Sequence, residues 1–246
     1  MRGERRAYLE PAPDGGLYWG PLAKGTLVRR YKRFLADVVL DDGAAIVAHT
    51  ANTGTMLGCS EPGRTVWLSR HEGRGRKHPF TLEMIDMPTA LVGVNTGVPN
   101  RLVKNAVLCG KIPELADYDA ARSEVGFGSS RLDLMLSSPE RGKAYVEIKN
   151  CSLAEDGVAY FPDAVTARGT KHLGELEIAV SRGERAVLFL LVQRGDATAF
   201  SPADHIDPEW GRALRRAISN SVEILAYRAR LGLDMTHVGP RLPVRL

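Results

Sequence analysis

Residues 129–150 read SSRLDLMLSSPERGKAYVEIKN, and they carry the clearest structural signal of the chain. It holds two segments in which charged or polar side chains alternate with aliphatic ones, joined by a polar turn. Because successive side chains of a strand point to opposite faces, the alternation predicts two strands, each with one aliphatic face. If the two strands pair, Asp133 meets Glu147 and Lys149 on a single face.

Two carboxylates and an ammonium group on one face are typical of a metal-dependent phosphodiesterase site. Asp133 and Glu147 offer the hard oxygen ligands that Mg²⁺ or Mn²⁺ prefers. Such a metal polarises a scissile phosphate, and Lys149 can orient or deprotonate the attacking water and stabilise the developing charge. We therefore expect a Mg²⁺ or Mn²⁺ cofactor and a catalytic set of Asp133, Glu147 and Lys149. The alternative is a set of surface charges, whose ion pairs are worth under ~1 kcal/mol.

The surrounding sequence predicts that residues 89–246 form an α/β domain. A continuous apolar segment, RAVLFLLVQ at residues 185–193, is typical of a central strand covered on both faces. Asn100 is the expected N-cap of the first helix. Helices are expected at residues 101–109, 172–181 and 208–218, and further strands at 123–126, 158–161 and 222–227. This order predicts an α/β/α sandwich around a mixed sheet.

The sequence pattern before this domain predicts that residues 21–88 form a small β domain. Short strands are expected at residues 26–31, 34–40, 44–49, 65–69 and 80–86. Five short strands favour an OB-like barrel, and a small β-sandwich stays open as the alternative. Residues 1–20 are rich in Pro and Gly, so we expect an irregular arm with a short strand entering at Leu17.

Basic residues gather in three segments that could contact phosphates. The segment VRRYKRF at residues 28–34 places cations beside aromatic rings, which suits a nucleic-acid groove, although a solvated edge strand has the same pattern. The second segment is the loop RHEGRGRKH at residues 70–78, and the third begins a helix near residue 168, where a helix N-terminus favours anions. The candidate nucleic-acid contacts are Arg29, Arg30, Tyr31, Lys32, Arg33, Arg74, Arg76, Lys77, Arg168, Lys171 and His172.

Composition narrows the class of protein. Hydrophobic content of 44% and charged content of 25% are those of a globular protein, and no apolar run approaches the ~20 residues that span a bilayer. The N-terminus lacks the apolar region of a signal peptide, so we expect a cytoplasmic protein without a membrane partner. Three cysteines with no CxxC pair argue for reduced thiols and against structural zinc. The net charge of +4 is compatible with a polyanion such as DNA but does not show one, and a homodimer stays open.

Several long motifs resemble those of a known family. They are KGTLVRRYKRFLADV, HTANTG, VNTGVPN, SRLD with YVEIKN, FPDAVTARGTKHL, RAVLFLLVQR and ADHIDPEW. From about Leu17 onward, the chain resembles the sugar fermentation stimulation protein A (SfsA) family. The resemblance implies an α/β chain, α+β overall, in which an OB-like domain precedes a restriction-endonuclease-like domain of the PD-(D/E)xK nuclease type. It also implies binding of DNA without strong sequence preference and a link to the regulation of sugar metabolism.

The resemblance places Asp133, Glu147 and Lys149 on the signature of the nuclease superfamily. That superfamily often adds an acid from its first helix, but residues 101–109 contain none, so Glu114 or Glu124 would have to serve. Three functions follow as hypotheses: a metal-dependent DNA nuclease, a non-catalytic DNA-binding regulator of sugar metabolism genes, and a module that binds RNA. No helix-turn-helix or zinc-finger motif is present, which argues against sequence-specific readout.

Overall fold

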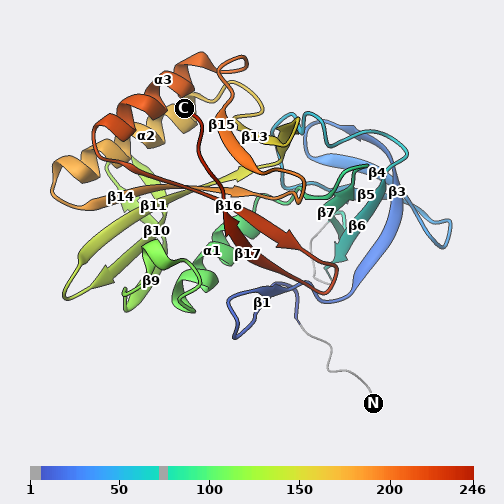
Figure 1. Cartoon of the computed structure of the whole chain (residues 1–246). Coiled ribbons are helices and arrows are strands. Elements are labelled where there is room, and N and C mark those ends of the chain that lie inside the picture. The colour runs from blue at the N-terminus through green and yellow to red at the C-terminus, as the bar shows by residue number, and fades with distance from the viewer. Residues whose placement is uncertain (1–6, 72–76) are drawn as a thin grey trace.

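The structure, a computed structural model, describes residues 7–71 and 77–246. It contains a β-barrel and a larger α/β domain that lie side by side (Figure 1). None of the described helices is long and apolar enough to cross a membrane.

The barrel is built from strands whose apolar side chains point inward. Its strands are β3 (Leu22–Tyr31), β4 (Leu35–Leu40), β5 (Ala45–His49), β6 (Thr65–Arg70) and β7 (Phe80–Asp86), and β8 (Leu91–Gly93) extends the sheet. The order is β5-β4-β3-β6-β7-β8, and an additional pairing of β5 with β7 closes the barrel. Alternate residues such as Leu27, Val38 and Val66 are buried inside it. The OB-like five-stranded barrel is therefore confirmed, and closure excludes the β-sandwich.

The α/β domain is a mixed sheet between helices, as predicted. Its sheet contains β9 (Ala120–Phe127), β10 (Ser130–Ser138), β11 (Gly142–Cys151), β14 (Arg185–Val192), β16 (Glu223–Leu231) and β17 (Met235–Arg241). Strands β11, β14 and β16 run parallel, whereas β9, β10 and β17 pair antiparallel with their neighbours. A small second sheet contains β12 (Leu153–Glu155), β13 (Val158–Phe161) and β15 (Ala199–Pro202).

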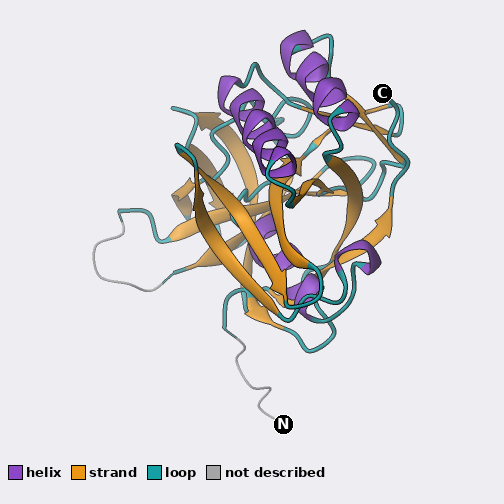
Figure 2. Cartoon of the chain, turned by 90° about the vertical axis from the view of Figure 1, so that its left-hand side faces the viewer, coloured by secondary structure: helices purple, strands orange, loops and turns teal. Residues whose placement is uncertain are grey.

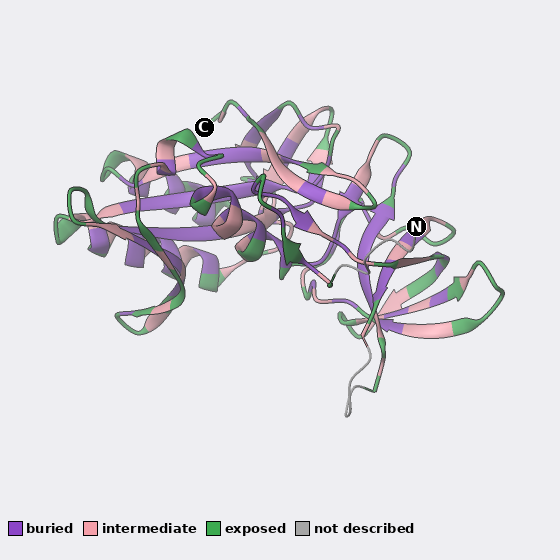
Figure 3. Ribbon diagram, turned by 90° about the horizontal axis from the view of Figure 1, so that it is seen from below, coloured by how far each residue is buried: buried purple, intermediate pink, exposed green. Residues whose placement is uncertain are grey.

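Helices cover both faces of the large sheet, which explains its buried apolar strands. Helix α1 (Val98–Leu108) packs on one face, and α2 (Ala167–Ser181) and α3 (Pro208–Ser219) lie side by side on the other (Figure 2). A short 3₁₀ helix, η1 (Pro113–Leu115), follows α1. The central strands of the sheet are buried along most of their length (Figure 3), because each contributes side chains to two apolar layers.

The N-terminal residues differ from the expected irregular arm. Strand β2 (Leu17–Tyr18) forms at the position predicted for a short strand, pairs with β1 (Glu10–Pro11) and joins the large sheet through β17. Leu9, Leu17 and Trp19 are buried in the core beside α1. The sequence did not predict β17 at all, because its Gly and Pro are depleted in strands.

Helix α1 also starts earlier than the sequence pattern predicts. The helix begins at Val98, so Asn100 lies in its first turn and is not the N-cap. Gly97 occupies the cap position without a side-chain hydrogen bond, and Pro99 fits the first turn because it has no N–H to satisfy. The side chain of Asn95 accepts the N–H of Gly97 at 2.8 Å and fixes the entry of the chain into the helix. This shift of the helix start turns Asn100 toward the predicted carboxylates.

Candidate active site

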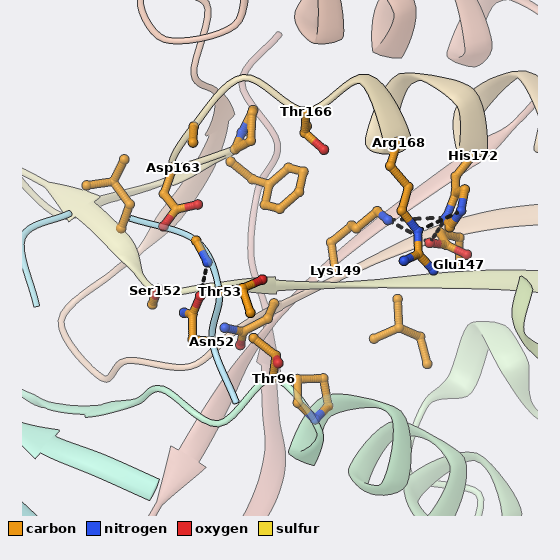
Figure 4. A pocket seen from close by; sticks show the side chains of 18 of the residues that line it. Asn52, Thr53, Thr96, Glu147, Lys149, Ser152, Asp163, Thr166, Arg168 and His172 are labelled. Atoms are coloured by element: carbon orange, nitrogen blue, oxygen red, sulfur yellow. Dashed lines mark hydrogen bonds and ion pairs between the residues drawn. The ribbon is translucent and has the colours of Figure 1, made fainter. Parts of the chain in front are cut away.

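A cavity of about 390 Å³ lies where the barrel meets the α/β domain, and the predicted carboxylates line it. The barrel contributes Arg33 and the loop that includes Asn52 and Thr53, whereas the α/β domain contributes β10, β11, the start of α1 and the segment that leads into α2. Figure 4 shows these side chains converging from separate elements. The cavity is therefore assembled by tertiary structure, with the barrel as one of its walls.

Asp133 lies where strands β10 and β11 stop pairing through their backbones. The backbone pairing of the two strands ends at Leu134 and Val146, and the Asp133 carboxylate then accepts the N–H of Ile148 at 2.8 Å. Its other oxygen accepts the side-chain amide of Asn100 at 2.8 Å. Burial and, second, the neighbouring charge of Glu147 raise the pKa of Asp133, because both disfavour its ionised form.

Glu147 is the most buried charged group of the cavity, with 1% of its surface exposed. Its Oε1 accepts a hydrogen bond from Lys149 Nζ at 2.6 Å and also contacts His172 Nδ1. Burial opposes ionisation of Glu147, but the hydrogen bond with His172 and the charge of Lys149 outweigh it and lower the pKa. Its Oε2 is buried without any hydrogen-bond partner in the described structure.

His172 reaches Glu147 from helix α2. Thr166 caps this helix by accepting the N–H of Gly169, and the ring of His172 lies more than one turn further along, only 5% exposed. Arg168 Nε donates to His172 Nε2 at 3.4 Å, so this ring nitrogen is an acceptor. The proton of a neutral ring then lies on Nδ1, where it is donated to Glu147. His172 thus fixes the orientation of a carboxylate.

Asp163 joins the barrel to the α/β domain at the opposite end of the cavity from this cluster (Figure 4). Its carboxylate accepts the N–H of Met56 at 2.9 Å, and the hydroxyl of Thr55 donates to its backbone carbonyl at 2.7 Å. Arg30 holds the same barrel loop from the other side, by donating to the carbonyls of Asn52 and Gly54. The barrel wall is therefore fixed by hydrogen bonds on both sides.

The structure brings some of the sequence-predicted residues together and separates others. Lys149 and Glu147 form an ion pair, and Asp133, Arg33 and Arg168 line the same cavity. Lys171 is exposed and lines a neighbouring hollow, which also includes Arg168 and His172. Leu132, expected on the same strand face as Leu134, packs instead on the α2 side of the sheet.

The basic strand of the barrel is largely engaged with the protein itself. Arg29 pairs with Asp37 at 2.7 Å and lies over the ring of Tyr31, and the guanidinium of Arg30 binds loop carbonyls. Burial lowers the pKa of Arg30. The exposed residues Lys32 and Lys77 do not line the cavity. Arg74 and Arg76 lie outside the described residues.

Neither acid suggested as a further metal ligand lines the cavity. Glu114 is engaged with the hydroxyl of Tyr227 at 2.6 Å and with Arg241 at 2.8 Å. Glu124 is exposed and lines two neighbouring hollows. Within residues 7–71 and 77–246, no group of three or more His, Cys, Asp or Glu side chains is arranged to hold a metal. The first helix offers the amide of Asn100 where an acid was sought.

The residues present nevertheless fit one divalent cation. The buried Oε2 of Glu147 has no hydrogen-bond partner, and an ionised carboxylate oxygen is costly to leave in that state. Asp133 supplies a second carboxylate beside it, and both offer the hard oxygen atoms that Mg²⁺ and Mn²⁺ bind. A cation there would offset the repulsion that raises the pKa of Asp133.

Three residues of this site have contacts that the sequence does not predict. The sequence predicts Asn100 as a helix cap and His172 as a phosphate contact, and it predicts no role for Asp163. The lack of acids in α1 was the one signal that could have drawn attention to Asn100. The contacts of His172 and Asp163 join residues that are 25 and 107 positions apart, and no local pattern records them.

Comparison with known proteins agrees with this architecture. A family model described as "Sugar fermentation stimulation protein RE domain" matches residues 97–235, and one described as "SfsA N-terminal OB domain" matches residues 28–94. A sugar fermentation stimulation protein homolog of Pelobacter propionicus is 52% identical over 227 residues, and one of Citrifermentans bemidjiense is 53% identical over 227 residues. Each alignment covers 92% of this chain and 98% of the homolog.

A solved structure shows the same fold. The SfsA protein of Pyrococcus furiosus superposes with a TM-score of 0.85 at 24% identity, over 98% of this chain and 100% of that chain. The two family models together match both the barrel and the α/β domain, and the relatives align over nearly the whole length. The chain therefore belongs to the sugar fermentation stimulation protein (SfsA) family.

Proposed function

We propose that this protein binds DNA without strong sequence preference and hydrolyses its phosphodiester bonds with the help of Mg²⁺ or Mn²⁺. One observation carries the proposal: two carboxylates, Asp133 and Glu147, lie with Lys149 in a cavity between two domains, and one buried oxygen of Glu147 has no partner. A protein that folds without a ligand gains nothing from such a cluster, because buried like charges repel and cost desolvation.

Each side chain has a distinct role in this proposal. Asp133 and Glu147 would hold the cation, which when bound supplies positive charge for the scissile phosphate and lowers the pKa of water. Asn100 and His172 orient the two carboxylates through their hydrogen bonds. Lys149 orients the attacking water and stabilises the charge that grows on the phosphate oxygens. The hydrogen bond from Lys149 to Glu147 supports this role, because it holds the ammonium group beside the proposed metal ligand.

Cations around the cavity suit a phosphate backbone. Arg33 and Arg168 line the cavity, and Arg131 and Lys171 line the adjacent hollow. No carboxylate of the described chain forms an ion pair with any of these four side chains, so their charge is available to a ligand. Binding of DNA through these four side chains would release counterions, so the affinity would fall steeply as the salt concentration rises.

The SfsA structure from Pyrococcus furiosus is described as a complex with Ca²⁺, a hard cation that takes oxygen ligands. This makes cation binding the first property to test. Isothermal titration of the purified protein with Mn²⁺ should show one site that is lost in Asp133→Ala and retained in Asp119→Asn, which changes an exposed acid outside the cavity. Equal titration curves for all three proteins would refute a cation site at Asp133.

Cleavage is tested separately with a labelled DNA and Mn²⁺. Wild-type protein should cut it, and Asp133→Ala and Lys149→Ala should not, since each removes a group that acts on the phosphate or the water. Lys149→Ala should retain most of the Mn²⁺ binding. Equal residual activity in the three preparations would identify a contaminating nuclease.

A second function has its own support: a non-catalytic DNA-binding regulator of sugar metabolism genes that retains a nuclease-like fold. The observation that favours it is that, among the described residues, no third acid lies close enough to Asp133 and Glu147 to form a three-ligand metal group with them. Salt-sensitive DNA binding together with no metal-dependent cleavage would select this function. Stronger binding of an RNA of the same sequence would instead favour a module that binds RNA.

A further inference from the structure

A second hollow, of about 480 Å³, adjoins the cavity along helix α1. We call it the α1 hollow and define it by Leu9, Pro11, Leu17, Arg101, Lys104 and Leu108. Asn100 lines both the α1 hollow and the cavity, and its side chain donates to Asp133. The two spaces therefore share a wall at Asn100, next to Asp133.

The α1 hollow combines an apolar lining with a basic rim. Leu108 of α1 is 52% exposed, so an apolar side chain is accessible to a ligand at this hollow. Arg101 is exposed and Lys104 is half-buried, with its Nζ 3.2 Å from the hydroxyl of Ser123. No carboxylate within residues 7–71 and 77–246 forms an ion pair with Arg101 or Lys104. The rim thus offers charge to phosphates and the lining offers apolar surface to a planar ring.

We infer that the α1 hollow binds an unpaired base of the DNA strand whose phosphate lies at Asp133 and Glu147. This rests on the proposed function and names its substrate class, single-stranded DNA. When a phosphate binds at the basic rim, the base of that nucleotide can enter the apolar hollow only if the base is unpaired. In a duplex the bases stay stacked inside the double helix. The exposed carboxylate of Glu124, at the edge of the hollow, can accept a hydrogen bond from a base amino group.

The alternative surface, the basic strand of the barrel, is less suited to this ligand. There Arg29 is paired with Asp37, and Arg30 is bound to loop carbonyls. Lys32 follows Arg30 in a turn where both Lys32 and Arg33 have positive φ, and only Arg33 of these residues lines the cavity. We therefore expect the bound DNA strand to run from the carboxylates along α1 and not along the basic strand of the barrel.

Leu108→Trp tests the base contact directly. The three natural tryptophans are Trp19 and Trp210, which are buried, and Trp67, which is partly buried, so the new exposed tryptophan dominates any change on stacking. In Ca²⁺ buffer, titration with a 20-nucleotide dT strand should quench Leu108→Trp fluorescence, whereas a 20-base-pair duplex and inorganic polyphosphate should not. The matched control is Phe34→Trp on the barrel, where the side chain is 45% exposed and quenching should be absent.

The basic rim is tested by fluorescence anisotropy with the same dT strand. The double variant Arg101→Ala with Lys104→Ala should bind about tenfold more weakly and reduce the slope of log K against log salt by roughly 1.4, at about 0.7 per lost contact. Arg29→Ala with Lys32→Ala removes the same charge from the barrel and should leave both quantities unchanged. Thermal unfolding shows whether each variant is folded.

The outcomes separate this inference from the proposed function. Binding of dT by wild-type protein, with no quenching of Leu108→Trp and no loss in the α1 double variant, would overturn the α1 hollow and leave DNA binding standing. Equal quenching by the duplex would overturn the unpaired base. No binding of either DNA by the wild-type protein would overturn both proposals.

Discussion

Replacing Lys149 by Met should destabilise the protein at neutral pH because it leaves Glu147 without its cation. The Lys149 and Glu147 side chains are 14% and 2% exposed, and their charged atoms are 2.6 Å apart. Removing one partner of a buried ion pair costs about 3–5 kcal/mol. Glu147 keeps its hydrogen bond to His172, so we expect the lower end, about 3 kcal/mol in the free energy of unfolding.

The loss of stability in Lys149→Met should depend on pH, and the ionisation of Glu147 determines whether it grows or shrinks as the pH rises. Its pKa is lowered in the folded protein, so its ionised form stabilises the fold above its ordinary pKa, and this contribution is lost as the pH falls through the lowered value. Lys149 is one cause of the lowering, and Lys149→Met should therefore cost more at pH 7.5 than at pH 4. The assay is urea unfolding in EDTA at both pH values, with Glu147→Gln and the double variant to complete a thermodynamic cycle.

Manganese should then restore part of what Lys149→Met loses. A cation that binds only the folded state stabilises by RT ln(1 + [L]/Kd), and in this variant it also replaces the missing positive charge beside Glu147. Mn²⁺ should therefore stabilise Lys149→Met more than the wild type. A cost below about 1 kcal/mol at pH 7.5, the same cost at pH 4, or an equal effect of Mn²⁺ on both proteins would refute the reasoning.

Three further predictions concern the same region. Asp163→Ala should lower the free energy of unfolding, measured in urea, by about 1–3 kcal/mol, because the N–H of Met56 loses its acceptor. Asp163→Asn keeps an acceptor and should therefore cost less. Equal costs for the two variants would contradict this contact. Arg30→Ala should lower the midpoint of thermal unfolding, because the hydrogen bonds of Arg30 to the loop carbonyls are lost. Lys32→Ala, which changes an exposed side chain, should leave the midpoint unchanged. The reverse ranking would be inconsistent with the structure. Asp133→Asn in EDTA should raise the free energy of unfolding at pH 7, because it removes a carboxylate whose ionised form is disfavoured by burial and by Glu147. The pKa of Asp133 is raised in the folded state, so the gain should vanish at low pH, where Asp133 is protonated, and a gain that persists there would have another cause.

Local patterns predicted most strands and helices because their signals come from neighbouring residues. The alternation in residues 129–150 predicted β10 and β11, and the apolar run at residues 185–193 predicted β14 between two helical layers. The same patterns failed where the sequence is not regular: β17 carries Gly and Pro, and β1 is too short to show a period. These strands form because the sheet already present offers them a partner.

The residue types of the candidate site could also be read from the chain, but not all of their roles. A guanidinium has the same chemistry toward a phosphate as toward a carbonyl, so the basic strand of the barrel did not reveal that Arg30 is a structural residue. Likewise, a histidine beside two cations resembles a phosphate contact until the fold places Glu147 against its ring.

Side-chain alternation along single strands is enough to predict the barrel, the mixed sheet and the position of Glu147 next to Lys149. Three contacts form only when the elements pack together: Asn100 orients Asp133, His172 orients Glu147, and Asp163 holds the barrel loop as one wall of the cavity. Each of these contacts joins elements that are distant in the chain. Their geometry follows from the packing of helices and barrel on the sheet, which no periodicity of the sequence records.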